Sequence, residues 1–139
     1  MKKLISFALM ISAIIFLSSC DCSVSTAKIT DVKVCTSLTG NHCDQDNTVI
    51  TDNPEAIYAS CLLKYAVANT QVKFTWYYYG QTKFEIDSVT LNTGEKSGNI
   101  ELSSNLSRPN NGWPKGVYDV VIEVLIDNGK PVTKQFTVQ

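Results

Sequence analysis

The sequence predicts an all-β protein, an antiparallel sandwich of two sheets with about seven strands. Apolar and polar residues alternate with a period of two along most of the chain, which is typical of strands that bury one face. Clusters of Gly, Asn, Asp and Pro separate these segments about every eight to twelve residues. No segment after residue 20 has a helical period. Strands are expected at 28–35, 57–65, 72–79, 83–91, 99–106, 117–126 and 132–138.

Two stretches depart from this regular pattern. Residues 36–54 contain Thr-Gly-Asn, several aspartates and a closing Asp-Asn-Pro, so we expect an irregular excursion there. Within residues 83–91 the apolar positions shift from Phe84 and Ile86 to Val89 and Leu91, as a β-bulge would produce.

The chain opens on a leader that is typical of exported proteins. Lys2 and Lys3 give it a positive start, and a mainly apolar run follows from residue 4 to residue 17. A bilayer-spanning helix needs about 20 apolar residues, and this run is shorter. We therefore expect a signal peptide over residues 1–19.

The leader ends on Leu17-Ser18-Ser19-Cys20. This tetrapeptide resembles the lipobox of bacterial lipoproteins, in which a leucine and two small residues precede the modified cysteine. The resemblance implies that Cys20 is the first mature residue, that its sulfur carries diacylglycerol and that its amino group takes a further acyl chain such as palmitate. Several buried chains, at about 0.8 kcal/mol per CH₂, suffice for stable anchoring to a membrane. The alternatives are an ordinary cleaved signal with a chance cysteine and an uncleaved anchor.

Residues 20–27 are expected to form a polar tether between the membrane and a domain over residues 28–139. Asp21, directly after the lipidated cysteine, resembles the inner-membrane retention signal of enterobacterial lipoproteins, whereas other bacteria follow other rules. The location in the cell envelope therefore stays open between the periplasmic face of the inner or outer membrane and the cell surface.

Length and charge narrow the classes of partner. The chain that remains after the leader suits one domain with a single modest core. The sequence has 12 Lys and Arg against 13 Asp and Glu, and Lys2 and Lys3 leave with the leader. Because no basic run or stripe is visible, nucleic acid is not an expected partner. For the same reason, nothing in the sequence draws the domain onto anionic lipid apart from its acyl chains.

Four further cysteines favour disulfides, because an even number in an exported chain usually pairs. Cys35 and Cys43 would close a short loop after the first strand, which leaves Cys22 for Cys61. Four cysteines allow three connectivities. If Cys61 faces the core, Cys35 is its rival partner.

Two aromatic residues sharpen the fold prediction. Trp76 lies in the third expected strand, where immunoglobulin-like sandwiches place their core tryptophan, and Tyr118 opens the sixth, where a tyrosine corner would lie. Val120 occupies the position of the usual second cysteine, so the intersheet disulfide of antibody domains cannot form. The chain is thus expected to be immunoglobulin-like in layout only.

Four segments together resemble a recurrent small extracytoplasmic β-sandwich of bacterial lipoproteins and envelope proteins. Its motifs are strand cores, a corner and a closing strand. They therefore indicate the fold of the chain better than they indicate its activity. Such modules mostly bind, space or scaffold, and the resemblance implies the same here. The segments are residues 57–60, 72–78, 112–120 and 136–138.

The sequence offers no catalytic constellation. His42 is the single histidine, Cys43 beside it is expected to be oxidised, and no serine lies in a glycine-framed elbow. Glu85, Asp119 and Glu123 fall on strand faces that we expect to be solvated, with nothing to hold two of them at acid–base distance. We expect neither an enzyme nor a cofactor.

A metal site is not expected either. Asp44-Gln45-Asp46-Asn47 places oxygen ligands at alternate positions, as calcium loops do, but it lacks the glycine and the late glutamate of an EF-hand. A solvated turn accounts for it. Zinc is less favoured still, because cysteines in an oxidising compartment pair first.

Aromatic residues are the most distinctive candidates for binding. Tyr77 and Tyr79 alternate with Trp76 and Tyr78, so they would stand on the outer face of the sheet, roughly 7 Å apart at about 3.3 Å per residue. Trp113 lies in a loop between prolines and glycines. Exposed Tyr and Trp suit protein interfaces and also stack on sugars. Alternatively, the two tyrosines only pair across strands and the tryptophan plugs the end of the sandwich.

Two functions are compatible with these features. The preferred one is a non-enzymatic envelope lipoprotein whose sandwich binds or scaffolds another envelope protein, as a subunit, inhibitor or adaptor. The alternative is a glycan-binding module that uses the exposed tyrosine face.

Overall fold

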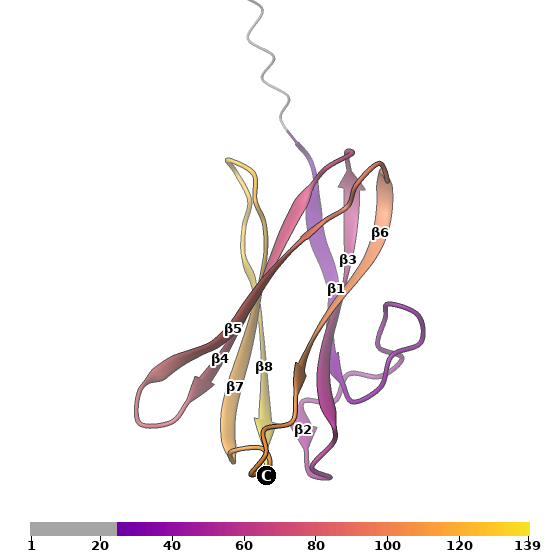
Figure 1. The fold of residues 1–139 in the computed structure, drawn as a ribbon. Coiled ribbons are helices and arrows are strands. Elements are labelled where there is room, and N and C mark those ends of the chain that lie inside the picture. The colour runs from indigo at the N-terminus through magenta and orange to yellow at the C-terminus, as the bar shows by residue number, and fades with distance from the viewer. Residues whose placement is uncertain (1–24) are drawn as a thin grey trace, which may run out of the picture.

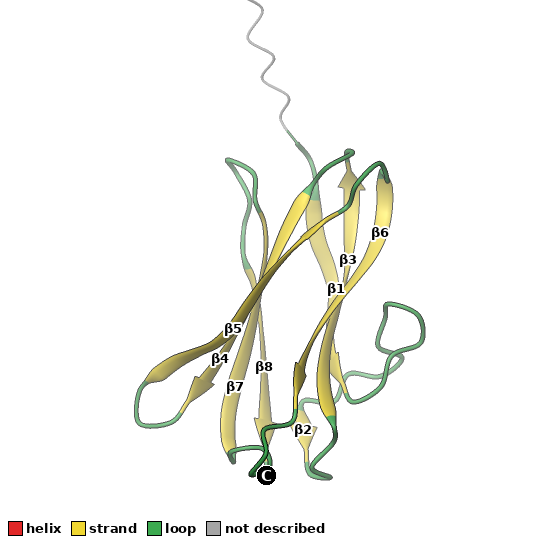
Figure 2. Ribbon diagram, in the orientation of Figure 1, coloured by secondary structure: helices red, strands yellow, loops and turns green. Residues whose placement is uncertain are grey.

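The computed structural model describes residues 25–139. The expected signal peptide, the expected lipidation site at Cys20 and the cysteine Cys22 lie outside this range. Within it no helix is long and apolar enough to cross a membrane. The elements are all strands (Figure 1, Figure 2): β1 (Lys28–Cys35), β2 (Val49–Ile50), β3 (Ala56–Ala66), β4 (Gln71–Tyr79), β5 (Lys83–Asn92), β6 (Gly98–Ser107), β7 (Gly116–Val124) and β8 (Val132–Val138).

These strands form two sheets that pack face to face (Figure 1). One sheet has three strands in the order β1-β3-β6, and the other has five in the order β2-β8-β7-β4-β5. Neighbours run antiparallel except β2 and β8, which are parallel. The predicted two-sheet sandwich is confirmed, and β2 is an additional strand within the stretch that the sequence marks as irregular.

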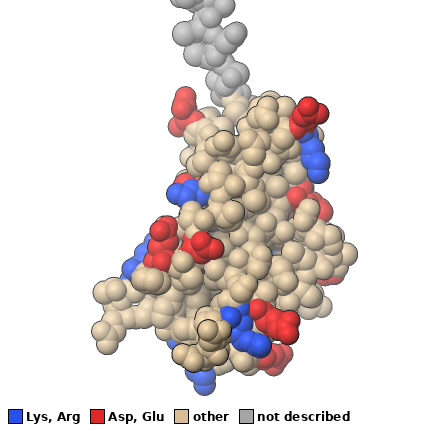
Figure 3. Space-filling model, in the orientation of Figure 1, with Lys and Arg blue, Asp and Glu red and all other residues tan. Residues whose placement is uncertain are grey.

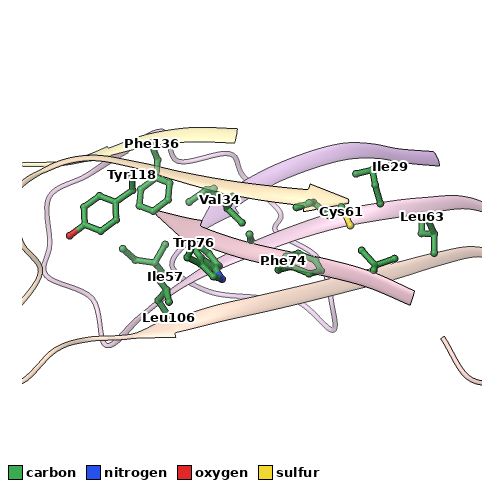
Figure 4. Close-up of a cluster of buried hydrophobic side chains, with 14 of the residues drawn as sticks. Ile29, Val34, Ile57, Cys61, Leu63, Phe74, Trp76, Leu106, Tyr118 and Phe136 are labelled. Carbon is green, nitrogen blue, oxygen red and sulfur yellow. The ribbon is translucent and has the colours of Figure 1, made fainter. Parts of the chain in front are cut away.

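The core lies between the two sheets and is built around aromatic rings (Figure 4). Trp76 and Tyr118 are each 1% exposed, as predicted. The Trp76 ring meets Phe136 edge to face at 6.2 Å between centroids, and its Nε1 donates to Ser104 Oγ at 3.2 Å, across to the other sheet. The Tyr118 hydroxyl donates to the Pro114 carbonyl at 2.6 Å, four residues upstream. This bond is the geometry of a tyrosine corner.

Irregular backbone positions decide which side chains reach this core. Asp31, with φ of 53°, marks a bulge in β1 that turns both Ile29 and Val34 inward. A second bulge near the end of β3 overturns one expectation. Strict alternation would place Tyr65 on the core face, but Tyr65 has φ of 59° and is 57% exposed, whereas Ala66 is buried.

The bulge expected within residues 83–91 is confirmed. The pairing of β5 with β4 shifts between Trp76 and Tyr77, so that Asp87 and then Glu85 are their partners and Ile86 is the extra residue. Charged side chains of both signs are interspersed on the face shown in Figure 3, and neither sign forms a broad patch there.

Candidate functional site

The free edge of β5 is the first component of the candidate site. β5 is the last strand of the five-stranded sheet and is paired with β4 alone among the described strands. Its inward face is not fully covered by the other sheet, because Phe84 is 62% exposed, Ile86 38% and Val89 36%. Unpaired backbone groups beside exposed apolar side chains are a ready template for pairing with another chain.

The second component is an apolar cavity beside this edge, which we call the distal cavity. Its volume is about 180 Å³. An apolar cavity of about 150 Å³ is large enough to hold benzene. The distal cavity therefore has room for one aromatic ring or one branched aliphatic group. It is lined by Tyr78, Phe84, Ile86, Leu106, Ser107, Pro109, Trp113, Pro114 and Tyr118.

Backbone carbonyls hold the aromatic walls of the distal cavity in place. The Tyr78 hydroxyl donates to the Lys115 carbonyl at 2.9 Å, and Trp113 Nε1 donates to the Pro54 carbonyl at 2.7 Å. The rings of Tyr78 and Tyr118 lie 4.9 Å apart between centroids. Because each polar atom already has a partner, the ring surfaces remain free for apolar contact.

Burial of the ring, and next the neighbouring Tyr78, raise the pKa of Tyr118 to about 12. The Tyr118 hydroxyl is therefore a neutral donor at physiological pH. Its hydrogen bond to the Pro114 carbonyl fixes the ring in the cavity wall.

The structure corrects the expectation for Trp113. The residue is 9% exposed, and its ring closes the end of the sandwich against Tyr118, with 6.5 Å between the ring centroids. An exposed aromatic anchor in this loop was the wrong interpretation, and the alternative, a tryptophan that plugs the end of the sandwich, is confirmed. Trp113 contributes to the site as a wall of the distal cavity.

The two other predicted binding residues, Tyr77 and Tyr79, lie on the outer face of the five-stranded sheet and are half-buried. Lys83 Nζ lies 4.1 Å from the centroid of the Tyr77 ring and 5.7 Å from that of Tyr79. The Tyr79 hydroxyl donates to Asp119 Oδ2 at 2.6 Å, and this hydrogen bond is the main cause that raises the pKa of Tyr79. Much of the capacity of these two residues for hydrogen bonds and cation–π contacts is thus used within the sheet.

Asp119 departs from the solvated position expected for it. It is 5% exposed, and its other oxygen, Oδ1, accepts from Gln135 Nε2 at 3.3 Å. Glu85 is exposed and Glu123 half-buried. The buried carboxylate serves to orient Tyr79 and Gln135.

The cysteines are partly resolved by the structure. Cys35 and Cys43 form the predicted disulfide, so the rival Cys35–Cys61 pairing was wrong. Cys61 is buried in the core, and desolvation raises the pKa of its thiol to about 12. The predicted partner Cys22 lies outside the described residues, and a Cys22–Cys61 bond stays a prediction.

The loop that this disulfide closes carries the single histidine. His42 Nε2 lies 3.0 Å from Asp44 Oδ1, and Nδ1 lies 3.4 Å from Glu101 Oε2. A hydrogen bond from Thr39 is the main cause that lowers the pKa of Asp44, and the neighbouring His42 adds to it. Both ring nitrogens therefore face carboxylates and neither faces a nucleophile.

The calcium-like segment is engaged by protein groups. Asp46 accepts from the backbone N–H of Val34 at 3.0 Å and pairs with Lys134, while Asp44 pairs with His42. Across residues 25–139, no group of three or more His, Cys, Asp or Glu side chains is placed to hold a metal ion.

The residues Phe84 and Ile86 were not recognised as site residues from the sequence. Their alternation predicts burial, as for any strand of a sandwich. The only sign of exposure is the bulge, because bulges are frequent at sheet edges. These side chains are exposed because β5 is the last strand of its sheet. The alternation of apolar and polar residues does not show where a strand lies in the sheet order.

The sequence matches no protein-family model and no curated protein. Its fold is similar to part of OgpA from Akkermansia muciniphila, with 14% identity, a TM-score of 0.46, and coverage of 80% of this chain and 26% of that one. It is also similar to a Niemann-Pick type C2 protein from the Japanese carpenter ant, with 13% identity, a TM-score of 0.48, and coverage of 81% and 92%.

A third similar structure is the alkylpurine DNA glycosylase AlkC of Pseudomonas fluorescens bound to DNA, with 18% identity, a TM-score of 0.41, and coverage of 81% of this chain and 30% of that one. This chain therefore spans only about a quarter to a third of the OgpA and AlkC chains. At these identities and TM-scores the similarities carry no conclusion about function.

Proposed function

We propose that this chain is a non-enzymatic, lipid-anchored module of the bacterial cell envelope that binds another protein through the free edge of β5 and the distal cavity. One observation carries the proposal: a cavity with room for one apolar side chain lies beside a strand edge that no other described strand pairs with. The lipid anchor at Cys20 is proposed from the lipobox resemblance.

The occupant that suits both components is an extended polypeptide segment. Strand addition supplies backbone hydrogen bonds along a sheet edge, and pockets for alternate side chains supply specificity. An added strand beside β5 would direct every second side chain toward the apolar surface of Phe84 and Ile86. A large apolar residue in that series would fill the distal cavity, whereas its neighbours would remain on the outer face with Lys83 and Glu85.

Photo-crosslinking in intact envelopes tests this proposal. A photoreactive residue in place of Phe84 should give one dominant adduct with another envelope protein. The matched control is Val49, which is 52% exposed on β2 at the opposite edge of the same sheet. The adduct identified by mass spectrometry then serves as the purified partner for binding measurements.

With that partner, Phe84→Asp is expected to weaken binding at least tenfold, because a carboxylate would be buried against apolar surface. Val49→Asp is expected to leave the affinity unchanged. Equal crosslinking at both positions, or equal affinities of the two variants, would contradict the proposed surface.

A glycan-binding module is the second candidate. The observation in its favour is the pair of half-buried rings of Tyr77 and Tyr79 on the outer sheet face, since aromatic rings stack on sugars. On a glycan array, the parent protein would then bind a defined glycan, and the double variant Tyr77→Ala/Tyr79→Ala would lose at least tenfold in affinity while still folding. An array without hits leaves protein binding as the single candidate.

A further inference from the structure

The end of the sandwich at which β1 begins gathers several turns, and we call it the tether end. The β3–β4, β5–β6 and β7–β8 turns meet there, opposite the β4–β5 hairpin (Figure 1). Backbone hydrogen bonds join these turns, from Asn69 N–H to the Gly94 carbonyl at 2.6 Å and from Leu125 N–H to the Gln71 carbonyl at 2.9 Å. The tether end is thus a connected surface.

Three of the seven large apolar side chains that are exposed among the described residues lie on the tether end. Val67 is 58% exposed, Tyr65 57% and Leu125 43%. The left-handed backbone of Tyr65, with φ of 59°, is costly for an aromatic residue, yet it turns the ring out of the core. Strained backbone that exposes a large ring is better explained by a surface that uses the ring than by packing.

Several lysines also lie at the tether end. Lys28 and Lys64 are cross-strand partners in β1 and β3, and Lys28 Nζ lies 5.8 Å from the centroid of the Tyr65 ring. Lys28 and Lys130 line one hollow of about 280 Å³. Lys96 lies in the β5–β6 turn, and the acidic side chains of the same turns are Glu95 and Asp127.

The distance to the proposed lipid anchor limits where this end can lie. Residues 20–27 can reach at most about 25 Å, at roughly 3.3–3.6 Å per residue. A strand as long as β3 extends further than that, at about 3.3 Å per residue. The proposed anchor therefore keeps the tether end within about 25 Å of the membrane, whereas the opposite end of the domain can lie further away.

We propose that the tether end rests on the surface of an anionic phospholipid bilayer. Tyr65, Val67 and Leu125 lie at the level of the headgroups, and Lys28, Lys64 and Lys130 lie beside lipid phosphates. This contact directs the distal cavity away from the membrane, toward a protein partner. The inference rests on the lipid anchor of the proposed function. The lysines are far apart in the sequence, which is why no basic run is visible before the chain is folded.

The test uses the mature lipidated protein in vesicles whose lipids carry bromine on the acyl chains near the headgroup, because bromine quenches tryptophan on contact. Both native tryptophans are buried. Val67→Trp places a reporter on the tether end. The matched control is Phe84→Trp at the distal end, because Phe84 has a similar exposed fraction of 62%.

In brominated phosphatidylglycerol vesicles we expect the added fluorescence of Val67→Trp to be quenched at least threefold more strongly than that of Phe84→Trp. Introducing Lys28→Glu, Lys64→Glu and Lys130→Glu together should abolish that difference, as should vesicles of brominated phosphatidylcholine alone. Equal quenching of the two reporters overturns the proposal. The proposal is also overturned if the quenching of Val67→Trp changes neither with the three lysine substitutions nor with the charge of the lipid headgroup.

Flotation of the same samples keeps the two hypotheses apart. A protein that does not float with vesicles lacks the lipid anchor, and the proposed function fails together with this inference. A protein that floats but leaves Val67→Trp no more quenched than the control retains the anchor, and only the docking of the tether end fails.

Discussion

The substitution Trp76→Ala tests the assignment of inner and outer faces on which the site depends. The Trp76 side chain is 1% exposed, meets Phe136 edge to face and donates to Ser104 across the sandwich. Truncating a buried tryptophan to alanine costs about 3–5 kcal/mol, from lost apolar contact and from the cavity that remains. Ser104 is only half-buried, so water can replace its lost partner and adds little to this cost.

A loss of this size is a large share of the roughly 5–15 kcal/mol that stabilises a typical domain. At about 4 °C per kcal/mol for a domain of this size, Tm is expected to fall by roughly 12–20 °C. Urea and thermal unfolding followed by circular dichroism measure the change. If the alanine variant does not fold, Trp76→Phe retains most of the ring and is expected to lose less stability.

The control is Tyr77→Ala, one residue further along β4 on the opposite face. Its ring is half-buried and contacts Lys83, a cation–π interaction that contributes about 0.5–1 kcal/mol at exposed sites. We expect Tyr77→Ala to cost far less than Trp76→Ala. If the two variants unfold at the same urea concentration, the faces of β4 have been assigned wrongly, and the site built on them is wrong too.

Three further predictions concern other parts of the chain. Replacing Cys20 with serine should leave an unprocessed or mislocalised precursor, and intact mass of the mature protein should show a chain that begins at Cys20 with added acyl mass; the same chain without that mass contradicts lipidation. Non-reducing peptide mapping should yield a Cys35–Cys43 peptide, and replacing both cysteines with serine should cost about 2–3 kcal/mol for a loop of this length; a Cys35–Cys61 peptide would refute the structure of this loop. The raised pKa of Tyr118, about 12 against an ordinary 10.0, means that the folded state favours the neutral phenol. Its contribution to stability is therefore complete below pH 10 and is lost as pH rises toward 12. Tyr118→Phe should reduce this loss of stability at alkaline pH, and it should cost about 1 kcal/mol at neutral pH through the missing hydrogen bond. If stability falls with alkaline pH as steeply in the variant as in the parent, Tyr118 is not the group responsible.

The sequence predicts the strands well, because alternation and turn residues are local signals. The predicted range 132–138 coincides with β8, and 72–79 differs from β4 by one residue at its start. β2 was missed, since two residues in parallel pairing leave no periodic trace. Tyr65 was misplaced because a tyrosine with positive φ has no signature in the sequence, whereas a glycine at that position would have suggested one.

The candidate site was much harder to predict than the strands. The distal cavity brings together β4, β5, β6, β7 and the loop before β7, and only the sheet order and the packing of the two sheets make these segments neighbours. The sequence left Trp113 open between an exposed binding residue and a plug, because the Pro54 carbonyl that its indole N–H reaches lies far upstream in the chain. Likewise, the burial of Asp119 depends on Tyr79 and Gln135, which lie on the two neighbouring strands.

The two margins of the five-stranded sheet are unequal. β2 covers one side of β8 and is fastened there by hydrogen bonds from Thr137 N–H to the Thr48 carbonyl and from Gln139 N–H to the Ile50 carbonyl, at 2.8 and 2.9 Å. β2 offers only two residues for further pairing, whereas β5 offers ten. Only the long edge strand, β5, can pair with a further strand or with the edge of a further sheet. Once that pairing is made, no second long edge of this sheet is left to extend it. This asymmetry limits growth through the five-stranded sheet to finite complexes, which would matter most if the lipid anchor proposed above concentrates the chain on a membrane.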